Sequence, residues 1–196
     1  MTSAGRNYST SGPGEPIPLV LFSATDDSLP ERGAPHAAAM LPAVRMLRAR
    51  RIPLVWISHA PAAVMLAVQA DCELCEPFIC NGGAYLYVPR TYFGDLGPLG
   101  TPAGDWDVVA FTARHDAGRA VQLLASLFRV EEPAAVIVGL AQDTTDGAVL
   151  EQVDVPVIVR SHRDLTALLR TFPDAYLTNA IGADGWREAV LEQRNE

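Results

Sequence analysis

The sequence predicts an α/β domain of three layers, in which helices cover both faces of a central, mostly parallel sheet. Short apolar runs alternate with segments whose apolar residues recur at helical spacing, as is typical of strands joined by right-handed crossover helices. The chain has 196 residues, of which 49 % are hydrophobic. This length is enough to bury one substantial core and short for two, so we expect one compact domain.

The expected elements follow one another in a regular order from residue 17 onward. Apolar runs bounded by polar residues indicate buried strands, and apolar residues three or four positions apart indicate helices with one buried side. The expected strands are residues 17–23, 54–57, 106–112, 134–140 and 155–159, with a hairpin over 78–88 around Asn81-Gly82-Gly83. The expected helices are residues 35–51, 61–70, 118–129, a segment capped by Asp164 and ending at Phe172, and 186–193, with a short helix after residue 146. Residues 89–105 and the segment around Gly182 and Gly185 are expected to be loops.

The N-terminal residues differ from the rest of the chain in composition. Residues 1–16 are rich in Ser, Gly, Pro and Thr and contain no apolar stretch of the kind that a secretory signal needs. We therefore expect a disordered leader ahead of a domain that spans residues 17–196. No run of about 18 apolar residues occurs, so we expect a cytoplasmic protein without a membrane partner.

The charged residues exclude several classes of function. All 15 positive charges are arginines, and a chain without lysine cannot form a Walker phosphate loop, a Schiff base or a Ser-Lys dyad. The formal net charge is -8 and no basic cluster occurs, so a nucleic-acid partner is not expected.

Polar residues follow three of the predicted strands, at about residues 24–28, 58–59 and 141–146. Loops that follow parallel strands meet at the carboxyl edge of an open sheet, where ligands bind. The sequence therefore places its candidate site at this edge.

Five segments of the chain carry a resemblance to a known family. They are LFSATDDSL at 21–29, IPLVWIS at 52–58, PFICNGGA at 77–84, VDVPVIV at 153–159 and GWREAVL at 185–191. In this order they resemble the motifs of the haloacid dehalogenase superfamily, in particular its mannosyl-3-phosphoglycerate phosphatase branch, over residues 19–192. The resemblance implies a three-layer α/β/α, Rossmann-like core and magnesium-dependent phosphatase chemistry through an aspartyl-phosphate.

The resemblance also implies that several catalytic groups are replaced. The nucleophilic aspartate corresponds to Ala24, whose methyl group cannot attack phosphorus, whereas the general acid/base position keeps its carboxylate as Asp26. The first metal-binding aspartate of the fourth motif corresponds to Gln142, and Asp146 keeps the second. The lysine that contacts the phosphoryl group corresponds to Ala117.

The polar residues that remain define a residual site. Asp26 is the candidate catalytic acid/base. The candidate phosphate-binding residues are Ser58, Asp27 and Ser28. The candidate metal ligands are Asp26, Asp143 and Asp146, with magnesium as the expected ion if activity or a metal site is retained and no cofactor otherwise. An alternative interpretation gives Asp26 and Asp146 only the role of capping loops and helix starts.

The segment that would carry a cap domain is short. Only about 35 residues separate the Asn81-Gly82-Gly83 hairpin from the helix at Gly118, so residues 89–106 are interpreted as the remnant of a cap insertion. Groups that select a substrate would then come from a partner subunit or be absent. Several aromatic residues gather here, which either form a dimer or ligand surface or belong to ordinary core and loop packing: Tyr85, Tyr87, Tyr92, Phe93 and Trp106.

The three cysteines form a C-x2-C-x4-C pattern at Cys72, Cys75 and Cys80. With His59 they could hold zinc, and two of them could form a redox dithiol. A strong zinc signal has two such knuckles, and a cysteine within an apolar strand behaves as a small hydrophobic residue. We therefore expect these residues to serve packing.

Three hypotheses follow for the function. The first is a catalytically inactive relative of the phosphatases that binds a phosphorylated small molecule or acts as a regulatory scaffold. The second is a magnesium-dependent phosphomonoesterase in which Asp26, Asp143 and Asp146 supply the carboxylates. The third is an oligomeric interaction protein, a homodimer formed through the uncapped face.

Overall fold

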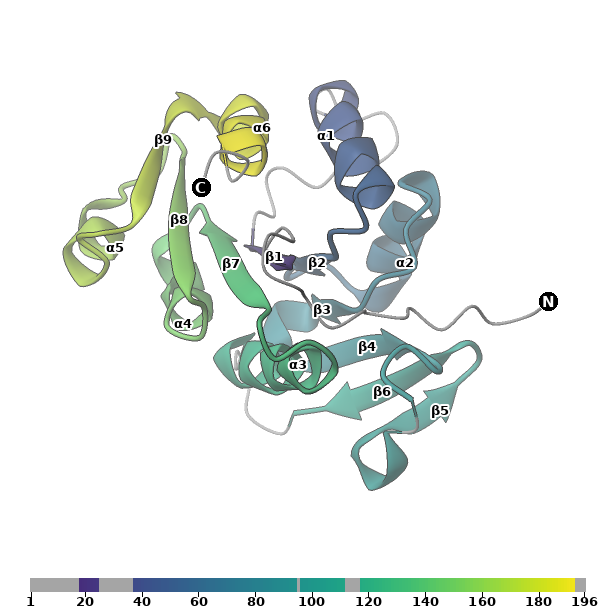
Figure 1. Ribbon diagram of the computed structural model, residues 1–196. Coiled ribbons are helices and arrows are strands. Elements are labelled where there is room, and N and C mark those ends of the chain that lie inside the picture. Colours follow the sequence, from purple (N-terminus) through teal and green to yellow (C-terminus); the bar gives the residue numbers. More distant parts are fainter. Residues whose placement is uncertain (1–17, 25–36, 95, 112–116, 193–196) are drawn as a thin grey trace.

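A nine-stranded sheet runs through the computed structural model, which describes residues 18–24, 37–94, 96–111 and 117–192 (Figure 1). The strand order is β5-β6-β4-β3-β2-β1-β7-β8-β9. Six neighbouring strands, from β3 to β9 in that order, are parallel, and β4, β6 and β5 continue the sheet in antiparallel fashion. The strands are β1 (Leu19–Ala24), β2 (Leu54–Ile57), β3 (Phe78–Cys80), β4 (Tyr85–Pro89), β5 (Thr101–Ala103), β6 (Trp106–Ala110), β7 (Val136–Ala141), β8 (Val155–Arg160) and β9 (Tyr176–Ile181).

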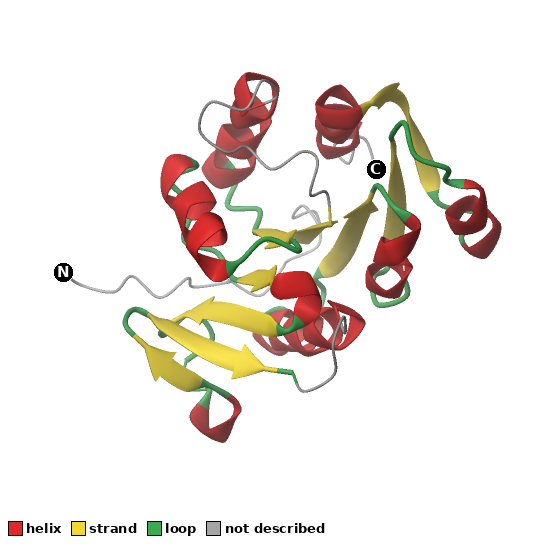
Figure 2. Ribbon diagram, turned by 180° about the vertical axis from the view of Figure 1, so that it is seen from behind, coloured by secondary structure: helices red, strands yellow, loops and turns green. Residues whose placement is uncertain are grey.

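Helices cover both faces of this sheet and complete the three layers. The helices are α1 (Ala37–Ala49), α2 (Ala62–Asp71), α3 (Ala117–Glu131), α4 (Gly147–Leu150), α5 (Thr166–Thr171) and α6 (Gly182–Glu192). Short 3-10 turns occur at η2 (Asn81–Gly83), η3 (Gly97–Leu99) and η4 (Thr144–Asp146). The core clusters place α1, α2 and α6 against one face and α3, α4 and α5 against the other, as Figure 2 shows from behind. The predicted α/β class and mostly parallel sheet are confirmed.

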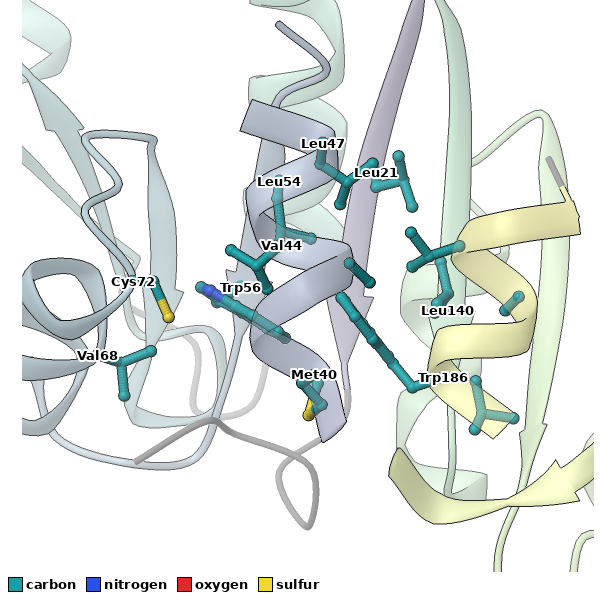
Figure 3. Close-up of a cluster of buried hydrophobic side chains, with 14 of the residues drawn as sticks. Leu21, Met40, Val44, Leu47, Leu54, Trp56, Val68, Cys72, Leu140 and Trp186 are labelled. Atoms are coloured by element: carbon teal, nitrogen blue, oxygen red, sulfur yellow. The ribbon is translucent and has the colours of Figure 1, made fainter. Parts of the chain in front are cut away.

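Two stacked tryptophans form the centre of the core on the α1 side (Figure 3). The indole rings of Trp56 in β2 and Trp186 in α6 lie 5.6 Å apart at 21°, and both side chains are fully buried. Trp186 Nε1 also donates a 2.9 Å hydrogen bond to Ser23 Oγ in β1. Burial of each indole removes a large apolar surface from water, and the stacking adds to that stabilisation.

The hairpin expected at Asn81-Gly82-Gly83 is present and turns the sheet from parallel to antiparallel. Phe78 of β3 pairs with Tyr87 of β4 across it. All three residues of η2 have positive φ angles, 53° at Asn81, 64° at Gly82 and 95° at Gly83. Asparagine and glycine tolerate this backbone region better than other residues, which explains why the chain turns here.

Two expectations about elements were wrong, and one strand was not expected from the sequence. Residues 89–105 are not only loop, because Thr101–Ala103 pair with β6 as the exposed edge strand β5, which is too short for a periodic signal. Residues 176–181 form β9, which pairs with β8 and contains the polar Thr178 and Asn179 in place of a continuous apolar run. Gly182 and Gly185 lie in helix α6 and not in a loop.

Close packing explains the glycine at position 185. A Cβ atom there would lie 2.4 Å from the carbonyl oxygen of Ala180 and 2.8 Å from Thr178 Oγ1. The first turn of α6 therefore contacts the end of β9 so closely that no larger residue fits. The glycine marks a helix–strand contact, although glycine in a sequence more often indicates a loop.

Glu188, about one turn further along α6, joins the same two elements. Its carboxylate accepts hydrogen bonds from the Tyr176 hydroxyl at 2.6 Å, from the backbone N–H groups of Asn179 and Ala180 at 2.8 Å each, and from Asn179 Nδ2 at 3.0 Å. These donors, led by the Asn179 N–H, lower the pKa of Glu188 to about 2. The β9–α6 connection is thus held by a fixed charge as well as by packing.

Within the part of the chain that the structure describes, every helix is too short or too polar to cross a bilayer.

We predict that Gly185→Ala lowers the free energy of unfolding by about 3 kcal/mol, because the added methyl group must push α6 away from β9. Gly147→Ala is the matched control, since a Cβ there meets nothing closer than 3.8 Å and alanine is the better helix former. Urea unfolding followed by circular dichroism measures both. Equal stability of the two variants would contradict the packing explanation.

Candidate functional site

Three adjacent parallel strands end side by side at the carboxyl edge of the sheet. Ala24 at the end of β1 pairs with Ile57 of β2 on one side and with Ala141 of β7 on the other. All three side chains are buried, with 4 %, 5 % and 0 % of their surface exposed. At the centre of the edge the described strands therefore end in apolar groups.

A cavity of about 320 Å³ opens at this edge, as the position of the polar loops predicts. The described residues that line it come from the end of β2 and the loop after it, from η2, from the first residue of α3, and from η4 and α4. They are Ile57, Ser58, His59, Gly82, Ala117, Thr145, Asp146, Ala148 and Val149. The volume is in the range of small-molecule sites.

Ser58 is a fixed part of the cavity wall. Its side chain is only 3 % exposed, and its Oγ accepts a 2.9 Å hydrogen bond from the backbone N–H of Ala60. Its own N–H donates to the carbonyl of Ile79, and its carbonyl accepts from the N–H of Gly82. The strand-end serine that the sequence singled out therefore lies in the cavity, held there by the β3–η2 hairpin.

Asp146 also lies in the cavity wall and is held by the backbone. Its Oδ2 atom accepts hydrogen bonds from the N–H groups of Gln142 at 3.1 Å and Asp143 at 3.0 Å. Together with the bond from the Thr145 N–H to Asp143 Oδ1, this arrangement forms a capping box around η4. The carboxylate thus has the role of a cap as well as a place in the wall.

Asp143 has different partners from Asp146 and is not among the described residues that line the cavity. Its Oδ1 accepts from the N–H of Thr145 at 2.9 Å and from Thr144 Oγ1 at 3.2 Å, and its Oδ2 is paired with Arg163 Nη1. The Thr145 N–H, followed by Arg163, lowers the pKa of Asp143 to about 2. The structure therefore brings Asp146 into the cavity and ties Asp143 to the loop after β8.

Besides Ala24, the two other positions that the resemblance gives as replaced, Ala117 and Gln142, carry uncharged side chains. Ala117, at the position where the resemblance places a lysine, lines the cavity with a methyl group at the start of α3. Gln142, at the position of the metal-binding aspartate, is 3 % exposed, and its carbonyl accepts a 3.0 Å hydrogen bond from Ser161 Oγ.

Asp26, Asp27 and Ser28 lie outside the described residues, so the roles given to them from the sequence remain predictions.

The described residues do not fit a magnesium site. Mg²⁺ requires several convergent oxygen ligands in near-octahedral geometry. The described cavity wall contributes one carboxylate, Asp146, which already accepts two backbone hydrogen bonds. No group of three or more His, Cys, Asp or Glu side chains within the described ranges is arranged to hold a metal ion.

The cysteines likewise form no metal cluster within the described ranges. Cys72 and Cys80 are buried in the core on the α2 side, whereas Cys75 is exposed. Burial raises the pKa of the Cys72 thiol to about 11, with a smaller contribution from Asp71, and burial raises the pKa of the Cys80 thiol to about 11. Both thiols are therefore protonated near neutral pH and unsuited to redox or metal chemistry.

The aromatic residues near the expected cap remnant belong mainly to packing. Tyr87 stacks on Phe78 with ring centres 4.9 Å apart, and Trp106 meets both rings edge-on. Tyr92 and Phe93 contact each other and the ring of Phe128 in α3. The exception is Tyr85, which is 39 % exposed.

Sequence reasoning missed several residues of the cavity. Gly82 was assigned only to a hairpin, and Ala148 and Val149 lie in a short helix that follows the polar cluster. Gly118 brings that helix close to α3, because a Cβ there would lie 2.9 Å from the Ala148 carbonyl oxygen. No local pattern signals a contact between two helices so far apart in the chain, although the glycine at the start of α3 is compatible with one.

The sequence matches no protein-family model and no curated protein. Solved structures do match the fold. A protein from Thermoplasma acidophilum aligns with a TM-score of 0.59 at 10 % identity, over 90 % of this chain and 97 % of that one. The cobalt-bound deoxy-D-mannose-octulosonate 8-phosphate phosphatase from Haemophilus influenzae aligns with a TM-score of 0.51 at 11 % identity, over 90 % and 88 % of the two chains. A haloacid dehalogenase-like hydrolase from Bacillus subtilis aligns with a TM-score of 0.51 at 8 % identity, over 93 % and 94 %. At these identities the likeness concerns the fold.

We predict that Asp143→Asn reduces the pH dependence of stability. The folded-state pKa of about 2 lies below the ordinary value of 3.8, so the charge of Asp143 stabilises the fold above about pH 4 and loses that effect as the pH falls toward 2. An asparagine side chain can still accept the hydrogen bond from the Thr145 N–H, but it has no charge to pair with Arg163. We therefore expect the free energy of unfolding at pH 7 to fall by about 0.5 kcal/mol.

Urea unfolding at pH 7, 5 and 3 measures this effect. Between pH 5 and pH 3 the wild type is expected to lose more stability than the variant. Parallel curves for the two proteins would contradict the assignment of the low pKa to Asp143.

Proposed function

We propose that this chain, which has the fold of the haloacid dehalogenase hydrolases, is a non-catalytic member of that superfamily that binds a small molecule at the carboxyl edge of its sheet. The observation that carries the proposal is the end of β1. There Ala24 is buried between Ile57 and Ala141, so the central strand delivers a methyl group where a phosphatase of this superfamily needs its nucleophile.

The replaced groups support the proposal jointly. A nucleophile, a metal-binding carboxylate and a phosphate-binding lysine act as one unit, and loss of the nucleophile alone removes most of the rate enhancement. In the relation to the mannosyl-3-phosphoglycerate phosphatase branch, their positions are Ala24, Gln142 and Ala117. Loss of all three is what relaxed selection on catalysis produces, while the retained cavity supports a role in binding.

Phosphate release from a broad panel of phosphorylated metabolites tests the absence of catalysis. We expect the wild type, with or without Mg²⁺, to release no more phosphate than Asp26→Asn prepared identically, because the variant reports contaminating phosphatases. Metal-dependent turnover that disappears in Asp26→Asn would overturn the proposal. It would support instead the magnesium-dependent phosphomonoesterase built on Asp26, Asp143 and Asp146.

A second candidate function, self-association, is supported by the antiparallel part of the sheet. Tyr85 pairs with Ala110 and Tyr87 with Val108, so these four side chains share one face of β4 and β6. None of the four is fully buried, and Tyr85 and Ala110 are exposed. An aromatic and aliphatic face of this kind is typical of a protein interface.

The expected result is a homodimer whose dissociation is promoted by Tyr85→Arg, because the substitution places a charge in the middle of the contact. Size-exclusion chromatography with light scattering at several protein concentrations measures the mass of each form. Arg90→Ala, a change in the exposed residue after β4, serves as the control. A monomeric wild type at every concentration would exclude this function.

A further inference from the structure

Helix α2 differs from α1, α3 and α6 in that its exposed side carries no polar side chain. Among its ten residues only Gln69 and Asp71 are polar, and Gln69 is buried. The residues on its exposed side are Ala63, Leu66, Ala67 and Ala70. A helix at the surface of a globular protein normally has charged or polar residues on its solvent side, and a helix that is apolar all round is normally buried. The exposed side of α2 therefore has the composition of a covered surface.

The β4–β6 face (Tyr85, Tyr87, Val108 and Ala110) lies on the same side of the sheet as α2. The ring of Tyr87 stacks on Phe78, which belongs to the core cluster that also contains the buried apolar residues of α2. Side chains two positions apart in a strand point to the same side, so Tyr85 points to this side as well. In Figures 1 and 2, α2 lies beside β3, and β4 and β6 continue the sheet beyond it. A raised helix and a partly exposed area of sheet thus adjoin and form an apolar step.

Charged side chains are missing from both parts of this step, the exposed side of α2 and the β4–β6 face. Asp107 of β6 points to the opposite side of the sheet, because it alternates with Val108 along the strand. Asp71, the charged residue of α2, is its last residue and is half-buried. In the chain as a whole, 19 % of the residues are charged. The step is therefore an uncharged area on a charged molecule.

A second copy of this chain is the partner that such a step fits best. Two molecules with a formal net charge of -8 repel each other, so they approach most closely where neither presents a charge. A two-fold axis brings each patch against the same patch of the other copy, and only an uncharged patch then meets no charge of its own sign. Two such steps also match in shape, since the helix of one copy fills the place beside the helix of the other.

The size of a stable interface indicates that both parts of the step are needed. Stable interfaces bury about 800 Å² on each partner. Neither the four exposed side chains of α2 nor the four side chains of the β4–β6 face supply such an area by themselves. An interface that spans both parts and the residues at their rims comes closer to it.

We infer that α2 is half of a two-fold symmetric dimer interface, in which α2 of each copy packs beside α2 of the other copy and against its β4–β6 face. The inference rests on the self-association proposed above and adds a helix to the surface that carries it. Short side chains at Ala63, Ala67 and Ala70 allow the two helices to approach closely. Leu66 and Tyr85, both partly exposed in one copy, supply apolar area that the contact removes from water.

Two matched arginine variants test whether α2 belongs to the interface. Leu66→Arg places a charge on the exposed side of α2, and Val130→Arg places the same charge at an exposed position of α3, on the opposite face of the sheet. Both variants change the net charge equally, so only the position differs. We expect Leu66→Arg to weaken dimerisation about tenfold or more and Val130→Arg to leave it unchanged, as measured by light scattering over a dilution series. Circular dichroism shows whether each variant keeps the fold.

Cross-linking of a cysteine at the middle of α2 gives a second measurement, which needs only a small substitution. Ala67→Cys in a Cys75→Ser background offers one accessible thiol in each chain, because Cys72 and Cys80 are buried. The middle of a helix lies near its own copy whether two paired helices run parallel or antiparallel. We expect a short bismaleimide to link two copies of this variant, and not two copies of Val130→Cys in the same background.

The outcomes separate this inference from the self-association on which it rests. A wild type that is monomeric at every concentration overturns both and leaves the surface to a different protein. A dimer that Tyr85→Arg dissociates and Leu66→Arg does not, or a dimer without a cross-link in Ala67→Cys, overturns the inference and leaves self-association in place. Equal weakening by Leu66→Arg and Val130→Arg also overturns it, because the effect then comes from the net charge.

Discussion

The contact between Trp186 and β1 is the interaction on which the rest of the structure depends. The indole N–H of Trp186, in the last helix, bonds to Ser23 in the first strand, and the same ring stacks on Trp56 in β2. Strand β1 lies between β2 and β7 in the middle of the sheet. The contact therefore holds helix α6 against the strand on which both halves of the sheet are built. The contact joins residues 163 positions apart, so its formation carries a large loop-closure entropy and depends on the rest of the fold.

Strand β1 also ends at the middle of the candidate site, where its last side chain is the uncharged Ala24. The parallel topology brings the ends of β1, β2 and β7 together whatever residues occupy them, so the fold supplies a cavity without supplying chemistry. Here Ala24 and Ile57 end two of those strands, and the polar groups Ser58 and Asp146 come from the loops beyond. The chemistry of this site therefore depends on the side chains that surround the sheet edge, while the scaffold below them has a fold that solved haloacid dehalogenase-like structures share.

How far the sequence predicts this structure depends on the kind of signal. Buried parallel strands read as continuous apolar runs, so β2 is predicted at its observed limits, and Ser58 and Asp146 are found because polar loops follow such strands. The edge strand β9 lacks that run, and Gly185 is a packing residue that looks like a loop residue. The part of the cavity formed by α4 depends on a long-range contact, which no local pattern contains.

The burial of two of the three cysteines gives the molecule a built-in chemical reporter. At neutral pH a thiol with a pKa of about 11 is ionised in about one molecule in ten thousand, and Cys72 and Cys80 are also shielded by α2 and the sheet. Cys75, four residues beyond the end of α2 at Asp71, is exposed to solvent. An alkylating reagent therefore distinguishes one accessible thiol from two that become reactive only when α2 separates from β3. The rate at which the second and third thiols are modified reports the opening of that region without any label being introduced.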